Sequence, residues 1–247
     1  MMCVPCGTER NDIMAKRTIT EMTYARAKEN LAKNAQTIEK LEKSGVLFIN
    51  AASCYVEENV KIGKGTVVEQ NVMLQGDTEI GENCVIGMGC KLVDTKVGDG
   101  SELLSVVSVD AVLGKNVLAG PFSYIRPGSK IADDVKVGDF VEVKNAVIDE
   151  GTKIAHLTYV GDSDVGKNVN FGCGTVTVNY DGKNKHRCKI GDDCFIGCNT
   201  NLVAPVTVGD GAYTAAGSTI TDEVPDKSLA IARARQVNKT AWRDKRD

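Results

Sequence analysis

The sequence predicts an all-β fold, a parallel β-helix built on a repeat of six residues. Aliphatic residues recur at sixth positions, a small or β-branched residue stands two positions before most of them, and glycine directly follows several. Chance does not hold this period over so many steps, so each aliphatic residue marks one short strand. The markers are Val56, Ile62, Val68, Leu74, Ile80, Ile86, Leu92, Val97, Leu113, Ala119, Ile125, Ile131, Val137, Val143, Ile154, Val160, Val165, Phe171, Ile190, Ile196, Leu202, Val208, Thr214 and Ile220.

The spacing of the markers also predicts the interior. Side chains two apart on a strand share a face, so the marker and the small residue before it both point inward. Three hexads make a triangular coil of about 18 residues, and residues 56–220 predict roughly eight or nine coils that rise about 4.8 Å each. Five cysteines occupy the small inward position, where a thiol behaves as a small hydrophobe. They are Cys54, Cys84, Cys90, Cys188 and Cys194.

The composition excludes several classes of protein. The chain has 247 residues, a formal charge of −3 and 42% hydrophobic residues, which describes a folded chain and not a disordered one. No apolar run is long enough for a transmembrane helix, and the net acidity argues against a general nucleic-acid binder. No secretory leader precedes the nine cysteines, so we expect a reduced, cytoplasmic protein without nucleic-acid or membrane partners.

The chain divides into four predicted regions. Residues 1–19 are expected to be a flexible leader, and residues 20–45 a linker helix, either a lid on the repeat or a solvated connector. The helix has a loose apolar stripe, made by Ala25, Leu31, Ala35, Ile38 and Leu41. Residues 46–232 form the predicted β-helix, interrupted by a loop at 179–189. Residues 233–247 are a basic tail, with six Lys or Arg against two Asp.

Two histidines narrow the chemistry. A β-helix carbonic anhydrase needs a zinc site of three histidines, which two cannot supply. His156 lies two residues after a marker, off the inward phase, and is a candidate general base. Cys173, Cys198 and Ala216 share that offset, which predicts one common surface. His186 stands among basic residues in the loop, where a solvated role is favoured over catalysis.

Four stretches carry a family resemblance: GPFSYIRPGSKI, GDFVEVKNAVI, KIAHLTYVGDSDVGKNVNFGCGTVTVNYDGKNKH and IGCNTNLVAPVTVGDGAYTAAGSTIT. They closely resemble the acetyltransferase half of the bacterial bifunctional N-acetylglucosamine-1-phosphate uridyltransferase/glucosamine-1-phosphate acetyltransferase family. HLTYVGD and NYDGKNK are far more specific than the hexads, which many acyltransferases share. The resemblance covers about residues 119–235 and implies a left-handed β-helix.

The resemblance implies an activity and a set of partners. It implies acetyl transfer from acetyl-CoA to the amine of glucosamine 1-phosphate, for synthesis of UDP-N-acetylglucosamine and cell-wall precursors. It also implies a homotrimer with sites between neighbouring prisms, and no metal is expected for acetyl transfer. The glycine-rich LxAGxGTRM loop of the uridyltransferase half has no counterpart here. Two alternatives stay open for that reaction: a separate uridyltransferase polypeptide, or a longer protein of which this chain is one half.

The resemblance also assigns site residues by motif. His156 is the implied general base. The sugar phosphate is implied to contact Arg126, Lys144, Tyr159, Asn170 and Lys185. The acetyl-CoA path is implied to pass Cys173, Asn179, Tyr180, Cys198, Ala216 and Arg233. Relatives usually carry Ala and Ser where this chain has Cys173 and Cys198, and loss of a serine hydroxyl is expected to weaken cofactor binding if that hydroxyl is used.

Two other functions remain open on the residues alone. The chain is alternatively an acyltransferase of the same fold acting on another amino sugar, or a non-catalytic β-helix that serves in assembly. The presence of Arg126, Lys144, His156 and Tyr159 together favours catalysis over the assembly role.

Overall fold

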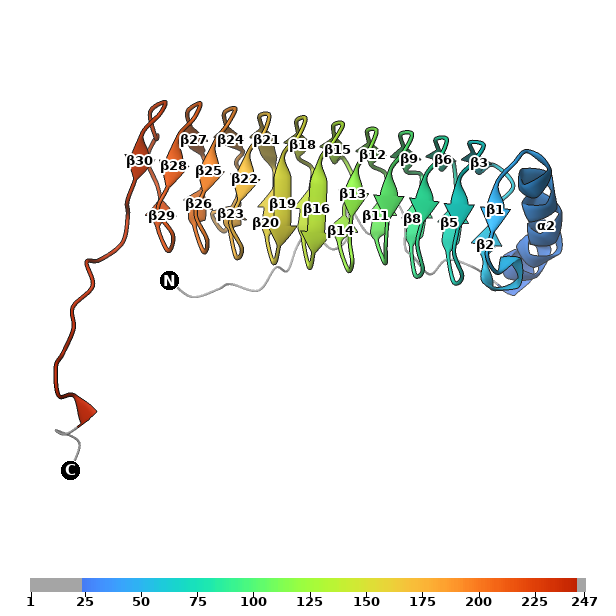
Figure 1. Ribbon diagram of the computed structural model, residues 1–247, viewed down its shortest axis with the longest axis horizontal. Helices are drawn as coiled ribbons and strands as arrows, with labels where there is room; N and C mark the ends of the chain where they lie inside the picture. Colours follow the sequence, from blue (N-terminus) through green and yellow to red (C-terminus); the bar gives the residue numbers. More distant parts are fainter. Residues whose placement is uncertain (1–23, 244–247) are drawn as a thin grey trace.

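The computed structural model describes residues 24–243 and has the predicted architecture, a parallel β-solenoid of about ten turns with one helix at its N-terminal end (Figure 1). Every strand pairs in parallel with the equivalent strand one coil away, which produces three flat sheets. The predicted leader, residues 1–19, lies outside the described residues.

The first sheet has eleven strands. In spatial order they are β1 (Leu47–Phe48), β4 (Val67–Val68), β7 (Val85–Ile86), β10 (Glu102–Leu103), β13 (Leu118–Ala119), β16 (Lys136–Asp139), β19 (Lys153–His156), β22 (Asn170–Phe171), β25 (Phe195–Ile196), β28 (Tyr213–Thr214) and β30 (Leu229–Ala230).

The second sheet has ten strands and the third has nine. The second contains β2 (Tyr55–Val56), β5 (Met73–Gln75), β8 (Lys91–Val93), β11 (Val107–Val109), β14 (Tyr124–Ile125), β17 (Glu142–Lys144), β20 (Tyr159–Gly161), β23 (Val176–Val178), β26 (Asn201–Val203) and β29 (Thr219–Ile220). The third contains β3 (Lys61–Ile62), β6 (Glu79–Ile80), β9 (Lys96–Val97), β12 (Val112–Leu113), β15 (Lys130–Ile131), β18 (Val147–Ile148), β21 (Ser163–Val165), β24 (Cys188–Ile190) and β27 (Val206–Val208).

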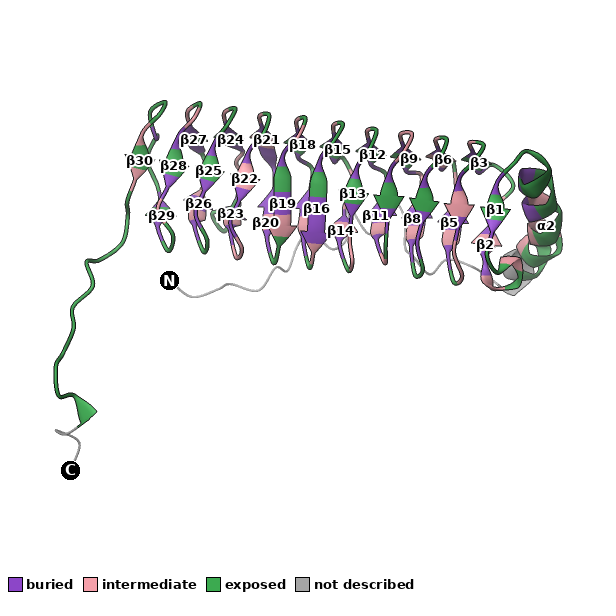
Figure 2. Cartoon of the chain, in the orientation of Figure 1, coloured by how far each residue is buried: buried purple, intermediate pink, exposed green. Residues whose placement is uncertain are grey.

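The core is the interior of the prism, as the markers predicted. All the marker residues are buried, and so are the small residues that precede them, including the five inward cysteines (Figure 2). Leu103, Ser108 and Thr177 also occupy inward positions, although the hexad count passed over them. Ser108 and Thr177 satisfy their hydroxyls inside, because Thr95 donates to Ser108 Oγ at 3.0 Å and Thr177 donates to the Gly161 carbonyl at 3.1 Å.

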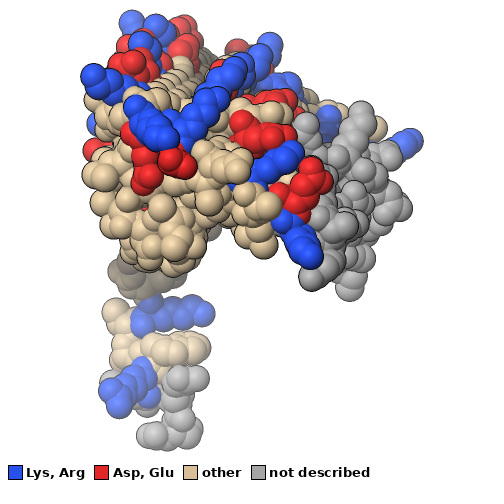
Figure 3. All heavy atoms as spheres, turned by 90° about the vertical axis from the view of Figure 1, so that its right-hand side faces the viewer, with Lys and Arg blue, Asp and Glu red and all other residues tan. Residues whose placement is uncertain are grey.

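Polar contacts between coils reinforce the stack. At one corner an aspartate accepts a hydrogen bond from the backbone N–H of the coil before it, as Asp133 does from Lys115 at 2.7 Å and Asp192 from Lys167 at 2.8 Å. Ion pairs also join neighbouring coils, for example Lys61 with Glu79 at 2.9 Å. Seen from the helix end, both signs of charge are interspersed on the same surface (Figure 3).

Helix α2 (Tyr24–Lys43) lies across the N-terminal end of the solenoid (Figure 1), and a 3-10 turn, η1 (Ala51–Ser53), follows β1. Ile38 and Leu41 are buried, whereas Leu31, expected in the apolar stripe, is 63% exposed. Asn34 bonds the first coil twice, donating to the Cys54 carbonyl and accepting from the Val56 N–H. The buried residues of the stripe thus lie in the C-terminal half of the helix, while Lys33 in the other half meets the first coil through an ion pair with Glu58.

Candidate functional site

His156 lies at the corner between the first and second sheets, at the end of β19. It faces out of the prism with 57% of its side chain exposed. The strand register places it directly beside Asp139 on the neighbouring coil, and its Nδ1 lies 2.5 Å from Asp139 Oδ1. Gly138 makes this close stacking possible, because a Cβ there would fall 1.8 Å from the Ala155 carbonyl oxygen.

The Asp139 carboxylate determines which imidazole nitrogen is basic. The hydrogen bond from His156 lowers the pKa of Asp139, so this carboxyl is ionised near neutral pH and only accepts hydrogen bonds. The proton of a neutral imidazole therefore sits on Nδ1, and the lone pair of Nε2 is left to accept a proton. The pair has the geometry of an oriented general base.

Cys173, Cys198 and Ala216 continue the same corner on the next three coils. Each follows an inward residue by two positions, and those inward residues are paired in register across β19, β22, β25 and β28. Asp139, His156, Cys173, Cys198 and Ala216 thus form one line along the solenoid, here called the corner column. The shared surface predicted from their phase is present.

A separate group of charged side chains lies on the outer face of the second sheet. Arg126 donates from its guanidinium to Glu142 Oε1 at 2.7 Å and lies 5.8 Å from the centre of the Tyr124 ring. Both side chains of the ion pair keep at least 30% of their surface exposed. The guanidinium is therefore held in place and still open on one side.

Lys144 lies on the next strand of this sheet and is almost buried. Its Nζ is 3.4 Å from Asp162 Oδ2. Burial lowers the pKa of Lys144, and the nearby ammonium of Lys185 lowers it further. Burial alone would raise the pKa of Asp162, but hydrogen bonds from Asn145 and Asn179 and the charge of Lys144 together hold it below its usual range.

Tyr159 and Asn179 complete this polar group. Asn179 is buried, and its amide donates both to Asp162 Oδ2 and to the Tyr159 hydroxyl, the latter at 3.3 Å. Position 161 requires glycine, because a Cβ there would lie 2.2 Å from the Tyr159 hydroxyl oxygen. Asn179, expected on the acetyl-CoA path, thus touches Tyr159, which is expected to bind the sugar phosphate.

The predicted loop leaves the second sheet after Val178 and returns to the third at Cys188. Asp181 closes it by accepting from the N–H groups of Asn184 and Lys183, and these bonds, together with one to His186, lower the pKa of Asp181 to about 2. Tyr180 and Lys185 pair across the loop by an antiparallel bridge. Lys185 is thereby brought near Lys144, two phosphate-binding candidates 41 positions apart in the sequence.

Two basic loop residues have structural partners. His186 Nε2 lies 2.7 Å from Asp181 Oδ2, an acceptor within the same loop. Arg187 binds the Asp164 carboxylate and donates to the carbonyls of Asn145 and Ser163. It therefore anchors the end of the loop to the solenoid.

Two predicted site residues lie apart from the second-sheet group. Asn170 is on β22 of the first sheet, on the other side of the corner column from Arg126, Lys144 and Tyr159. Arg233 follows β30 at the C-terminal end of the solenoid. A Cβ added to Gly217 would lie 3.8 Å from Arg233 Cδ, so this side chain is close to the residue that follows Ala216. A single copy of the chain does not place all the predicted residues on one face.

Three acidic partners were missed by the sequence analysis: Asp139, Glu142 and Asp162. Asp139 carried a usable signal, because it follows the marker Val137 by the same two positions that separate His156 from Ile154. Glu142 and Asp162 had no comparable signal, because their importance arises from neighbours one coil away.

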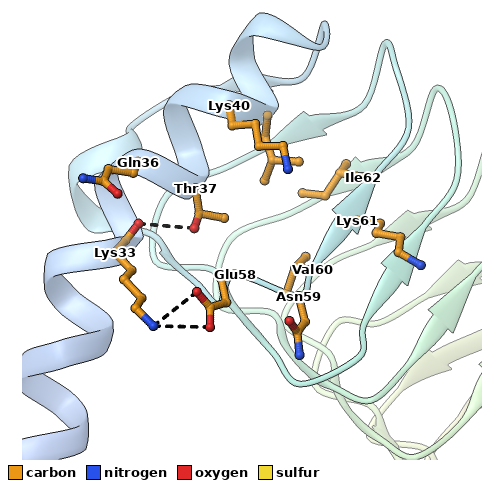
Figure 4. A pocket seen from close by; sticks show the side chains of 10 residues that line it. Lys33, Gln36, Thr37, Lys40, Glu58, Asn59, Val60, Lys61 and Ile62 are labelled. Atoms are coloured by element: carbon orange, nitrogen blue, oxygen red, sulfur yellow. Dashed lines mark hydrogen bonds and ion pairs between the residues drawn. The ribbon is translucent and has the colours of Figure 1, made fainter.

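An open groove of about 650 Å³ lies elsewhere, between α2 and the first coil (Figure 4). Its lining includes Lys33, Lys40 and Lys61. Lys33 and Lys61 are each within 3.3 Å of a carboxylate, so most of the positive charge is already paired. The groove is at the opposite end of the solenoid from the Cys198 coil and contributes nothing to the corner column.

Within residues 24–243, no cluster of three or more metal-ligating side chains occurs. In the same part of the chain, no helix combines the length and apolarity needed to cross a membrane.

Comparison with known proteins gives consistent matches. The family model of bacterial transferase hexapeptide repeats matches residues 53–93, 110–145 and 187–222. The chain is 53% identical over 202 residues to the bifunctional protein GlmU of Geobacillus sp., covering 82% of this chain and 44% of that protein. It is 47% identical to the GlmU of Clostridioides difficile, and the match covers 94% of this chain and 52% of that protein. The chain thus spans about half the length of the curated relatives it matches.

Among solved structures, the UDP-N-acetylglucosamine acyltransferase from Campylobacter jejuni is similar at 21% identity and a TM-score of 0.48, covering 79% of this chain and 77% of that one.

Proposed function

Because the chain belongs to the hexapeptide-repeat family of bacterial transferases, we propose that it transfers acetyl from acetyl-CoA to the amine of glucosamine 1-phosphate. The observation that carries this proposal is the Asp139–His156 pair, an oriented base on the outer edge of the prism. The similarity to GlmU proteins over nearly the whole described chain supports the choice of reaction. The product, N-acetylglucosamine 1-phosphate, would enter UDP-N-acetylglucosamine and peptidoglycan synthesis in the cytoplasm.

The second-sheet group is proposed to hold the phosphate. Arg126, Lys144 and Lys185 supply positive charge. Burial and, next, the nearby Lys185 lower the pKa of Lys144, and a bound phosphate dianion compensates the repulsion between the two ammonium groups. Tyr159 adds a hydroxyl at the edge of this group. Tyr159 follows His156 by three residues around the corner at Leu157, so this hydroxyl and the proposed base lie on either side of the same corner of the prism.

The proposed chemistry is a direct transfer. His156 Nε2 takes a proton from the sugar amine as its nitrogen attacks the thioester carbonyl. The tetrahedral intermediate then collapses, the C–S bond breaks, and the departing CoA thiolate takes the proton from His156 Nε2. The corner column beyond His156, from Cys173 to Ala216, is proposed to line the acetyl-CoA path, with Tyr180 and Arg233 at its sides. No protein nucleophile and no metal is needed for this route.

The site is proposed to be completed by another copy of the chain, in a homotrimer. Asn170 lies around the corner from the phosphate group, so a neighbouring prism is the simplest way to bring the two faces together. An apolar strip beside the column supports such contact. Phe122, Phe140 and Leu157 are each at least 57% exposed despite their bulk, and the two rings stack with centres 5.5 Å apart.

The test is release of the CoA thiol from acetyl-CoA in the presence of glucosamine 1-phosphate, with the His156→Ala variant as control. We expect release by the intact chain and a loss of about 10²–10⁴ in rate for the variant. Absence of release by the intact chain, or full activity in the variant, would refute the proposal.

A further inference from the structure

Two thiols that are at least partly exposed lie on adjacent rungs of the corner column. The register of β22 with β25 pairs Phe171 with Ile196. Cys173 follows Phe171 by two residues, and Cys198 follows Ile196 by two residues. The Gly172 N–H donates to the Ile196 carbonyl at 2.7 Å, and the Asn199 N–H donates to the Cys173 carbonyl at 2.8 Å. These bonds bracket Cys173 and Cys198 and fix them directly opposite each other.

These two thiols differ from the other cysteines in the described region. Cys198 is exposed and Cys173 partly exposed, whereas the remaining five are buried in the prism. Burial raises the pKa values of Cys90 and Cys188 to about 11, which keeps those thiols protonated and unreactive. Oxidation in residues 24–243 is therefore expected to fall on Cys173 and Cys198.

The spacing of the coils suits a covalent link. Paired residues on neighbouring parallel strands are about 4.8 Å apart at Cα. A disulfide accepts Cα separations of about 4.4–6.8 Å and needs Cβ atoms within about 4.5 Å. The cysteines therefore require a local shift of less than about 1 Å to reach bonding distance. Both stand at a corner between strands, where such a shift does not break a β-ladder.

We propose that Cys173 and Cys198 form an oxidisable dithiol, a modification site for peroxides. One thiolate attacks the O–O bond of hydrogen peroxide to give a sulfenic acid and water. The second thiolate attacks that sulfur, expels a second water and forms the disulfide, so two thiols and one peroxide give one disulfide and two waters. A dithiol reductant reverses the reaction by exchange.

The link has a consequence for the cofactor, and this part rests on the proposed function. Both sulfurs lie on the expected acetyl-CoA path, one and two rungs from His156. A disulfide fixes both side chains and removes two thiol donors from that surface. Acetyl-CoA binding is therefore expected to weaken at least tenfold on oxidation and to recover on reduction.

The test uses the full chain with Cys3→Ser and Cys6→Ser, which removes the two thiols outside the described residues. The protein is treated with hydrogen peroxide, unreacted thiols are alkylated after denaturation, and the peptides are analysed by mass spectrometry. We expect one cross-linked peptide pair joining Cys173 to Cys198, absent after dithiothreitol and absent from a Cys198→Ser control. Separate sulfinic acids, or two free thiols after peroxide treatment, would overturn the proposal.

Calorimetry with acetyl-CoA on the oxidised and reduced protein distinguishes the two proposals. A cross-link that leaves acetyl-CoA affinity unchanged removes the regulatory consequence and retains the modification site. A cross-link in a protein that binds no acetyl-CoA even when reduced counts against the proposed acetyltransferase instead.

Discussion

Asp139 gives His156 its orientation, and this contact tests the role of the histidine at the scale of one side chain. In Asp139→Asn the amide competes as a donor for Nδ1 and favours the tautomer whose Nε2 carries the proton. We expect kcat to fall about 10²-fold or more with little change in the KM for acetyl-CoA. Steady-state kinetics measure both, and Asp139→Glu should restore part of the rate. An unchanged kcat in Asp139→Asn would show that the pair has no role in orientation.

Asp162 is expected to matter for stability, because it is the buried counter-charge of Lys144. Asp162→Ala leaves that ammonium buried and unpaired, and we expect a loss of about 3 kcal/mol in the free energy of unfolding. Asp162→Asn keeps the side-chain shape and should lose less. Urea denaturation at pH 7 measures both variants, and equal midpoints for Asp162→Ala and the parent would contradict this account.

The same pair predicts how stability depends on pH. The folded-state pKa of Asp162 lies below its unfolded value of about 3.9, so its contribution is present above about pH 4. That contribution is lost as the pH falls through the folded-state value. The stability difference between the parent and Asp162→Asn should therefore shrink on acidification below pH 4. A difference independent of pH between 2 and 7 would exclude this linkage.

Lys144 predicts a pH limit on binding of glucosamine 1-phosphate. Burial lowers the pKa of Lys144, so as the pH rises this lysine loses its positive charge before pH reaches about 10.4, the pKa of an ordinary lysine. Affinity for glucosamine 1-phosphate should decline between pH 7 and 10 in the parent chain. It should stay level in Lys144→Arg, because a guanidinium stays protonated over this range. Isothermal titration between pH 7 and 10 tests this, and matching alkaline declines in both proteins would contradict it.

At the scale of elements, the loop 179–189 is an excursion whose shape depends on Asp181. Asp181→Ala removes the acceptor for two backbone N–H groups and for His186. We expect the KM for glucosamine 1-phosphate to rise about tenfold, because Lys185 is no longer held near Lys144, and the melting temperature to change little. Lys183→Ala on the same loop serves as the control. An equal KM for both variants would remove the loop from phosphate binding.

The elements also show what the sequence could predict. The hexad period located the prism interior because the inward residues must be apolar at every rung, and the fold class is confirmed. Inward Ser108 and Thr177 escaped the period because hydrogen bonds between neighbouring coils, and not apolarity, make them fit. Leu31 was misplaced because the length of contact between α2 and the first coil is set by the angle of the helix, which periodicity does not contain.

The site was predictable in part for a similar reason. A shared offset from the markers gathered His156, Cys173, Cys198 and Ala216 into one column, and the same offset would have added Asp139. The contacts of Lys144 with Asp162 and of Asn179 with Tyr159 join residues 18 and 20 positions apart on neighbouring coils. Such pairs depend on coil length and loop placement, and several coils have 16 or 17 residues instead of 18 without a clear sequence signal.

At the scale of the whole molecule, the apolar strip predicts an assembly. Phe140→Asp puts a charge in the middle of the strip, and we expect the trimer to dissociate and acetyl transfer to fall with it. Val112→Asp, a similarly exposed apolar position on the third sheet, is the matched control. Analytical ultracentrifugation measures the mass and circular dichroism checks the fold. A trimeric Phe140→Asp, or a parent chain that sediments as a monomer, would contradict this arrangement.

The most direct measurement is a comparison of acceptors. The full chain is given acetyl-CoA with glucosamine 1-phosphate, glucosamine 6-phosphate or glucosamine, and acetylated product is quantified for each, in parallel with Lys144→Ala. The account predicts that kcat/KM for glucosamine 1-phosphate exceeds that for glucosamine by at least about 10², since charge-assisted bonds to phosphate contribute about 1.5–3 kcal/mol each, and that Lys144→Ala narrows this gap. Equal rates with and without the phosphate, or a preference for another phosphorylated sugar, would contradict it.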